Sequence, residues 1–269
     1  MEYNDAQVAA HIRGILSRVA ESHQSCSFPP EQSRSITLSL YQSFSFLSFL
    51  GITMALKLYG FPMSSPTACV MTCLAEKEVE YEIVNVDLSK GEHKVPTFLA
   101  KNPFGQIPVL EDGSVTLFES RAITWYIAHK YESGTDLSRN ENMEASAVVG
   151  VWLEVESKQF NPVIHTIIFE QLIKPVFYHQ TPDQSIIDEN LAKLVPVLDV
   201  YDTRLSYSKY LACDSFTLAD LHHLPYIYYF MKTPWTDMIT SRANVRAWWE
   251  DISARPSFVK VAQLIEIQE

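Results

Sequence analysis

From residue 54 onward, apolar and polar positions follow short-range patterns that predict an α/β unit. Strands are predicted where apolar and polar residues alternate, and helices where apolar residues recur every three or four positions. The predicted strands are residues 55–60, 81–86, 107–110 and 115–118, and the predicted helices are residues 66–76 and 120–131. The resulting order is β-α-β, a connection and then β-β-α. This order describes an α/β unit of about 80 residues, a normal size for a small domain.

Residues 132–140 (ESGTDLSRN) are predicted to be a linker, and the pattern beyond them is helical. In residues 186–205, apolar side chains recur at intervals of four and three, which is typical of one helix face. This face consists of Ile187, Leu191, Leu194, Leu198, Tyr201 and Leu205. Pro196 is expected to bend the helix because proline lacks an amide hydrogen. The run Thr217-Leu-Ala-Asp220 predicts a capping box at the start of another helix.

The first 53 residues follow a different pattern. Residues 1–35 are polar and rich in serine, whereas residues 36–53 carry no charge. Ten of these 18 uncharged residues are apolar but seven are Ser, Thr or Gln, which makes a weak candidate for a membrane span. The apolar run begins too late for a secretory signal, and the acidic residues before it do not suit a transit peptide. We therefore expect a poorly structured N-terminal extension in residues 1–53.

Composition and charge narrow the class of protein. The chain has 269 residues, of which 47% are hydrophobic, so disorder throughout is excluded. Its 32 acidic and 21 basic residues give a net charge of −11, which repels nucleic-acid phosphates and anionic lipid. Four scattered cysteines are too few for a disulfide scaffold and favour reduced thiols in a cytosol-like compartment.

The first turn of the α/β unit, residues 61–66 (FPMSSP), joins a predicted strand to a predicted helix. Ser64 and Ser65 therefore lie at a helix N-terminus, where unpaired amides and the helix macrodipole favour an anion. Taken alone, a serine at this place is more often a helix N-cap than a catalytic group.

The other reactive side chains predict neither a metal site nor a redox pair. Cys69 and Cys73 are four residues apart, which matches neither a CxxC pair nor a zinc pair, so we expect buried structural thiols. His222 and His223 are adjacent on a predicted helix and point about 100° apart, which suits metal binding poorly. The aromatic residues among 226–230 are expected to be mostly core.

Seven short motifs occur in order along the chain. The first four are KLYG (57–60), GEHK (91–94), NPFGQIP (102–108) and LFESRAI (117–123), and the last three are VWLEVE (151–156), TLAD (217–220) and AWWEDISARPS (247–257). The first four resemble the glutathione-binding half of glutathione S-transferases, and the last three resemble the helical half of the plant phi class. The resemblance covers residues 54–269. It implies a thioredoxin-like domain in residues 54–132 and an all-helical domain in residues 141–269 that lines a hydrophobic substrate site.

Ser64 matches the family's catalytic serine, whose hydroxyl would donate to the sulfur of glutathione and favour the thiolate. A cysteine-type thiol has a pKa of about 8.5, so only a few per cent is ionised at neutral pH. A hydrogen bond to a charged group contributes about 1.5–3 kcal/mol, and a helix N-terminus about 0.3–1 kcal/mol. Their sum lowers the pKa of the thiol by roughly 1.3 to 3, at about 1.36 kcal/mol for each unit. The thiolate then becomes a major species without a His/Asp partner.

The resemblance also implies which residues bind glutathione. They are Ser64, Ser65, His93, Lys94, Gln106, Ile107, Pro108, Glu119 and Ser120. Residues 106–108 match a loop in which a cis-proline exposes the preceding backbone to the cysteinyl part of the tripeptide; a proline that simply opens a strand is the alternative. Residues 119–120 match the pair that holds the γ-glutamyl end, and Ser120 is also expected to be the N-cap of its helix. Residues 93–94 match residues around the glycine carboxylate, or form an ordinary solvated pair.

The implied activity is conjugation of reduced glutathione, as co-substrate and without a cofactor, to hydrophobic electrophiles in an apolar cleft between the domains. Reduction of organic hydroperoxides is an expected second activity. A homodimer in the cytosol is also implied, with Phe104 either an anchor in the partner subunit or a local core residue. Many phi-type sequences have a basic residue in place of Cys69, so the thiolate loses some electrostatic support here.

That departure favours an alternative function, in which the chain is a carrier that binds flavonoid-like ligands with little turnover. A third possibility is a membrane-tethered form that uses residues 36–53. The sequence predicts no nucleic-acid partner and no stable membrane insertion.

Overall fold

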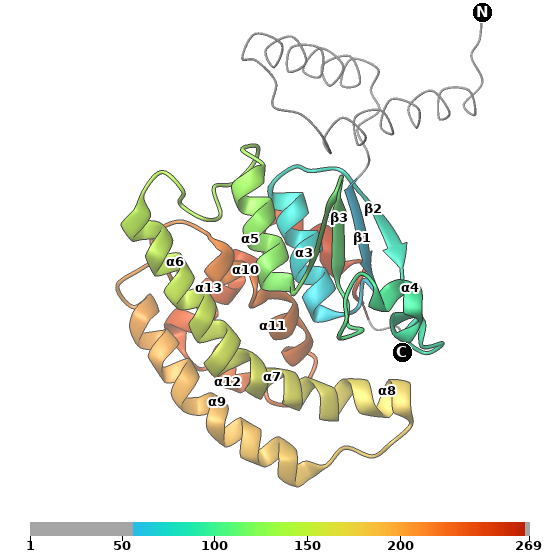
Figure 1. The fold of residues 1–269 in the computed structure, drawn as a ribbon. Helices are drawn as coiled ribbons and strands as arrows, with labels where there is room; N and C mark the ends of the chain where they lie inside the picture. Colours follow the sequence, from blue (N-terminus) through green and yellow to red (C-terminus); the bar gives the residue numbers. More distant parts are fainter. Residues whose placement is uncertain (1–55, 267–269) are drawn as a thin grey trace, which may run out of the picture. The chain divides into compact units, whose positions relative to one another are not determined.

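A four-stranded sheet forms the centre of the N-terminal half of the structure, a computed structural model that describes residues 56–266 (Figure 1). The strands are β1 (Leu56–Gly60), β2 (Tyr81–Asn85), β3 (Val109–Asp112) and β4 (Val115–Phe118). Their spatial order is β2-β1-β3-β4, with β1 and β2 parallel and the other neighbours antiparallel. The expectations for residues 1–53 lie outside the described residues.

The strand predicted in residues 107–110 is present as β3, but it begins two residues later than predicted. Pro108 has no amide hydrogen to donate to a ladder, and the peptide bond that precedes it is cis. The strand instead continues to Asp112, which pairs with Val115 across a turn at Gly113 and Ser114. Gly113 adopts a φ of 62°, a conformation that glycine reaches without steric cost.

Helices α3 (Ser65–Glu76) and α5 (Ser120–Lys130) contact each other on the face of the sheet that is turned toward the helical half (Figure 1). The short 3₁₀ turn Glu92–Lys94 and helix α4 (Pro96–Leu99) lie in the connection from β2 to β3. Gly60 allows α3 to approach the end of β1, because a Cβ there would lie 2.6 Å from the Thr67 methyl group.

The second half of the described chain is helical, as predicted. One long run contains α6 (Met143–Val155), α7 (Asn161–Ile168) and α8 (Lys174–Tyr178), and it is followed by α9 (Gln184–Leu205), α10 (Leu218–Leu221), α11 (Leu224–Phe230), α12 (Asp237–Thr240), α13 (Ala243–Ser253) and α14 (Pro256–Ala262). Two π-helical turns, Glu156–Phe160 and Phe169–Ile173, interrupt the long run. A proline follows each turn, Pro162 and Pro175, and neither can donate the regular backbone hydrogen bond.

The predicted amphipathic face of residues 186–205 is confirmed in α9. Ile187, Leu194, Leu198 and Tyr201 are buried, and Leu191 and Leu205 are half-buried against the same core. Pro196 lies inside this helix. The helix begins after Asp183, whose carboxylate accepts hydrogen bonds from the amides of Ser185 and Ile186.

One hydrophobic core extends from the sheet through α3 and α5 into the helical half. A smaller cluster of Val86, Phe98 and Val109 packs on the other face of the sheet, together with Tyr59 and Phe118. The continuous core holds the sheet and the helices in a fixed arrangement, because close-packed interiors resist displacement of one layer against another.

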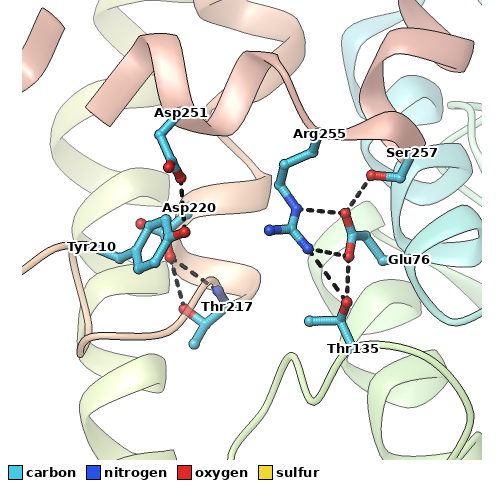
Figure 2. Close-up of polar contacts among 8 residues, drawn as sticks. All are labelled: Glu76, Thr135, Tyr210, Thr217, Asp220, Asp251, Arg255 and Ser257. Carbon is cyan, nitrogen blue, oxygen red and sulfur yellow. Dashed lines mark hydrogen bonds and ion pairs between the residues drawn. The ribbon is translucent and has the colours of Figure 1, made fainter. Parts of the chain in front are cut away.

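Polar contacts also join the two halves (Figure 2). The carboxylate of Glu76, at the end of α3, accepts hydrogen bonds from Arg255 Nε and Nη2 at 2.7 Å each. Thr135 Oγ1 donates to the same carboxylate at 2.6 Å, and Ser257 Oγ also donates to it. Because Glu76 is buried, this network replaces the water that the charge loses on folding.

The predicted capping box at the start of α10 is present. The amide of Thr217 donates to Asp220 Oδ2 at 3.0 Å, and the Thr217 hydroxyl donates to the same oxygen at 3.1 Å (Figure 2). The other oxygen of Asp220 accepts from Trp248 Nε1 and the Leu211 amide, each at 3.0 Å. The box therefore also ties α10 to α13.

Candidate active site

The strand register brings the sequence-predicted site segments to one edge of the sheet. Val109, the first residue of β3, pairs with Tyr59 near the end of β1 and with Phe118 at the end of β4. The segments that precede Val109 and follow the other two strands must therefore meet there. These segments are residues 106–108, 61–65 and 119–120.

Ser64 lies between the end of β1 and the first turn of α3. It is the N-cap residue of α3, with extended backbone (φ −71°, ψ 121°), but its hydroxyl caps no amide of the helix. Its own amide donates to the Phe61 carbonyl, and its carbonyl accepts from the Ala68 amide, both at 2.9 Å. The backbone of Ser64 is thus held on both sides, while the residue is half-buried and its hydroxyl is left for another partner.

Helix α3 supplies a favourable field for an anion at this end. It has 12 residues, so its peptide dipoles sum over three turns behind the Ser64 hydroxyl. Ser65 is buried at the first helical position, and Pro66 follows it with a φ suited to a helix start. An anion placed beside Ser64 would meet a hydroxyl donor and the positive end of the helix together.

The loop before β3 exposes backbone groups next to Ser64. The Ile107–Pro108 peptide bond is cis, and Asn102 Nδ2 donates to the Gln106 carbonyl at 2.7 Å, which holds the loop from behind. Within residues 56–266, the amide and the carbonyl of Ile107 have no hydrogen-bond partner. Because β1–β3 pairing ends at Val109, the Ile107 backbone is open to an added extended segment.

Glu119 and Ser120 follow β4 at the same edge of the sheet. Glu119 is exposed and adopts φ 70° and ψ 110°, an uncommon conformation for a residue with a Cβ. Such strain is typical of positions where a backbone is held for function. The expectation that Ser120 is the N-cap of α5 was wrong. The unusual backbone of Glu119 makes that residue the N-cap, and Ser120 is the buried first residue of the helix.

His93 and Lys94 lie in the 3₁₀ turn that packs on the loop before β3. Lys94 Nζ donates to the carbonyls of Phe104 and Gly105 at 3.1 and 2.8 Å. Gly105 has a φ of 58°, and a Cβ there would lie 2.7 Å from the His93 carbonyl, so only glycine permits this approach. Burial, and then the charge of Lys94, lower the pKa of His93, so its imidazole is neutral at pH 7.

The two helix cysteines are buried, as predicted. Neither Cys69 nor Cys73 is exposed, and their thiols donate to the carbonyls of His222 and Thr124 at 3.7 and 3.6 Å. Burial is the main cause that raises the pKa of both thiols, so both stay protonated. Arg121 and the buried carboxylate of Glu156 form an ion pair near Cys69, with 2.7 Å between Nε and Oε2. The expectation that Cys69, in place of a basic residue, reduces the electrostatic support for the glutathione thiolate stays a prediction.

His222 and His223 do not form a metal site. They have separate partners, Thr124 Oγ1 and Tyr201 Oη, at 2.8 and 2.9 Å from their Nε2 atoms. Among the described residues, no three His, Cys, Asp or Glu side chains are placed to hold a metal ion.

Tyr229 is a residue near the site whose contact the sequence did not reveal. It lies in the predicted aromatic core run, and it is buried there. Its hydroxyl donates to the carbonyl of Met63, directly before Ser64, at 2.8 Å. A buried tyrosine hydroxyl needs a polar partner, but only the tertiary structure shows which one.

Two open surface pockets lie on the helical half. One, of about 380 Å³, is lined by residues of α6 and α9, among them Trp152 and Arg204, and by Tyr207 just after α9. The other, of about 540 Å³, lies along the end of α6 and the following π-helical turn. Neither is lined by Ser64 or another sequence-predicted site residue.

Comparison with known proteins gives the family. A family model described as the N-terminal domain of glutathione S-transferase matches residues 54–129, and one for its C-terminal domain matches residues 160–256. The chain belongs to the glutathione S-transferase family. The first match contains the four motifs of the glutathione-binding half, and the second contains TLAD (217–220) and all but the last residue of AWWEDISARPS (247–257).

Close relatives place the transferase in the plant phi class. Glutathione S-transferase F13 of Arabidopsis thaliana is 51% identical over 210 residues, which cover 78% of this chain and 95% of the relative. The crystal structure of glutathione transferase F7 from Populus trichocarpa is 57% identical and covers 79% of this chain and all of that one, with a TM-score of 0.77. Glutathione S-transferase I from maize, in complex with an atrazine glutathione conjugate, is 44% identical over 78% of this chain and 98% of its own, with a TM-score of 0.74.

These findings confirm the fold class, a thioredoxin-like N-terminal half followed by a helical one, and the transferase activity with glutathione as co-substrate. They support an enzyme rather than the alternative carrier of hydrophobic ligands. None of the helices in residues 56–266 combines the length and apolarity that a membrane span requires. The uncharged segment 36–53, on which a tethered form would depend, lies outside the described residues.

Proposed function

We propose that Ser64 is the catalytic residue of this transferase and stabilises the thiolate of bound glutathione. The observation that carries the proposal is the position of its hydroxyl, which caps no amide at the N-terminus of α3 although the backbone on both sides is hydrogen-bonded. The hydroxyl donates to the sulfur, and the helix dipole favours the same charge. The thiol proton leaves to solvent, and the thiolate then attacks an electrophilic carbon; with a chloronitrobenzene the C–S bond forms as the C–Cl bond breaks and chloride leaves.

The rest of the tripeptide lies along the edge of the sheet. Its cysteinyl backbone pairs with the open amide and carbonyl of Ile107, as an added strand would, beside Gln106 and Pro108. Its γ-glutamyl end reaches Glu119 and Ser120, with Ser65 nearby. The neutral His93 and the charged Lys94 hold the glycine carboxylate at the other end of the molecule.

The electrophile binds in an apolar cleft between a glutathione-binding domain, residues 54–132, and a helical domain, residues 141–269. The rate acceleration there comes mainly from formation of the thiolate and from proximity, because the two reacting atoms are held next to each other. The same thiolate reduces organic hydroperoxides as a second activity. The biological role is detoxification in the cytosol.

We further propose that the enzyme is a homodimer. Large apolar side chains are exposed in the loop before β3 and on helices α5 and α6, among them Phe104, Trp125, Met143 and Val151. Phe104 is 64% exposed, which argues against the alternative that it is a local core residue. Large apolar side chains that are exposed to this degree favour a protein interface.

The test is conjugation of glutathione to a chloronitrobenzene by the wild type and Ser64→Ala, with glutathione affinity measured by calorimetry. Ser114→Ala, in the exposed β3–β4 turn, is the matched control. We expect Ser64→Ala to lose about 30-fold or more in turnover, the equivalent of one hydrogen bond to an anion, while glutathione still binds. Full turnover in Ser64→Ala would refute the catalytic role, and binding without turnover in the wild type would restore the carrier hypothesis.

A further inference from the structure

The peptide group that precedes Ser64 is held at both of its ends. Its carbonyl oxygen, on Met63, accepts a hydrogen bond from the Tyr229 hydroxyl at 2.8 Å. Its amide, on Ser64, donates to the Phe61 carbonyl at 2.9 Å. A peptide group is planar and rigid, so two hydrogen bonds at opposite ends define the orientation of the whole plane.

The orientation of this plane decides where the Ser64 hydroxyl can lie. The bond from the Ser64 nitrogen to its Cα leaves from the plane, and the Ser64 carbonyl is already held by the first turn of α3. With the backbone defined on both sides, only the side-chain torsion of Ser64 remains free, and it has three staggered positions. Rotation of the Met63–Ser64 plane would move all three positions relative to glutathione.

The residue that holds the Met63 carbonyl belongs to the helical half. Tyr229 lies in α11, 166 positions after Met63 in the sequence, and its side chain is buried. Its hydroxyl also lies 3.0 Å from the carbonyl of Ile265, near the end of the described chain. A phenol has one hydrogen to donate, so the two carbonyls share it. The same hydroxyl thereby links three segments: the Ser64 turn, α11 and the residues after α14.

We propose that Tyr229 is a positioning residue of the transferase, which holds the Met63–Ser64 peptide plane so that the Ser64 hydroxyl points at the glutathione sulfur. The inference rests on the proposed role of Ser64. Tyr229 does not touch the sulfur; it acts through the backbone of its neighbour. Loss of its hydroxyl leaves the half-buried Met63 carbonyl without this partner, and the plane turns toward another donor.

The test compares Tyr229→Phe with Tyr228→Phe. Tyr228 is the adjacent residue of the same helix, and its hydroxyl donates to the Ala262 carbonyl at 3.5 Å, with no hydrogen bond to the Ser64 turn among the described residues. The readouts are kcat, KM for glutathione and the pKa of the bound thiol, taken from the ultraviolet absorbance of the thiolate and from the pH profile of kcat/KM. The pKa is independent of the amount of folded enzyme, so it decides the test even if a variant is partly unfolded.

We expect Tyr229→Phe to raise the pKa of the bound thiol and to lower kcat about 3- to 10-fold, because small displacements of a catalytic group are costly. Tyr228→Phe should leave both values unchanged. In a Ser64→Ala background, Tyr229→Phe should have no further effect on the thiol pKa, because the two residues act through one hydroxyl.

The outcomes separate this inference from the one on which it rests. If Ser64→Ala keeps full turnover, the role of Ser64 fails and the positioning role fails with it. If Ser64→Ala loses turnover but Tyr229→Phe keeps the wild-type thiol pKa, only the positioning role is overturned. It is also overturned if Tyr228→Phe shifts the pKa equally, or if Tyr229→Phe still shifts it without the Ser64 hydroxyl.

Discussion

Removal of the Arg255 charge tests how the two halves of the transferase are held together. In Arg255→Met the aliphatic stem stays, but the two hydrogen bonds from the guanidinium to the Glu76 carboxylate are lost (Figure 2). Glu76 is only 6% exposed, so the remaining donors, Thr135 and Ser257, must stabilise a charge that water cannot reach.

The expected loss of stability follows from this burial. Removal of one partner from a buried ion pair costs about 3–5 kcal/mol. The Arg255 side chain is 24% exposed, which places the change near the lower end of that range. The guanidinium also lies 4.0 Å from the centre of the Phe216 ring, and loss of that contact adds about 0.5–1 kcal/mol. We therefore expect Arg255→Met to lower the free energy of unfolding by about 3–4 kcal/mol.

The assay is urea unfolding followed by tryptophan fluorescence, at pH 7 and at one protomer concentration, because association shifts apparent stability. The matched control is Lys193→Met, which removes a cation from the Lys193–Glu189 pair. Both side chains of that pair are more than half exposed, so its loss should cost less than about 1 kcal/mol. A loss in Arg255→Met no larger than in this control would refute the reasoning.

The stability difference between the wild type and Arg255→Met is also expected to depend on pH. Burial by itself raises the pKa of Glu76, but the hydrogen bonds from Arg255, Ser257 and Thr135 outweigh it and leave the pKa below its ordinary value of 4.5. A lowered carboxyl pKa stabilises the fold above that ordinary value, and the stabilisation is lost as pH falls through the folded value. The stability difference between the wild type and Arg255→Met should therefore shrink below pH 4.5.

Three further predictions concern a buried carboxylate, two buried thiols and a glycine with a positive φ. Asp220→Asn should lower the free energy of unfolding by about 2–4 kcal/mol in urea, because the amide nitrogen that replaces one carboxylate oxygen cannot accept a hydrogen bond and leaves buried donors without a partner. Maleimide should leave Cys69 and Cys73 unmodified in peptide mass spectra until denaturant is added, since neither is exposed. Gly134→Ala should lower Tm by several degrees, because φ is 67° and its Cβ would lie 2.0 Å from the Glu76 carbonyl oxygen; an unchanged Tm would contradict this.

Local sequence patterns predicted the structure correctly where a residue's neighbours in the sequence are also its neighbours in space. The alternation in residues 81–86 and the apolar spacing in residues 186–205 correspond to β2 and α9 within two residues at each end. The capping box at Thr217 is likewise a contact between residues three positions apart. Such features depend on backbone geometry and on solvent, both of which are the same in any fold.

Element boundaries that depend on special backbone conformations were harder to predict from the sequence. The late start of β3 follows from Pro108, which has no amide hydrogen to donate to the ladder, and the displaced N-cap of α5 follows from the positive φ of Glu119. A positive φ is uncommon for a residue with a Cβ, so local propensity argues against it. The π-helical turns before Pro162 and Pro175 were missed for a related reason, since a proline in a helical pattern permits a kink, a break or a bulge.

By itself the sequence determined the order of the strands and of the two main helices of the α/β unit, the apolar face of α9, and the set of motifs that indicates a glutathione S-transferase. Only the tertiary structure decided that Tyr229 reaches the carbonyl before Ser64 and that Arg255 lies against Glu76. Both contacts join residues more than 160 positions apart in the sequence. They form only after the core has brought the two halves together, because a hydrogen bond needs its two atoms within about 3 Å and no sequence pattern encodes that distance.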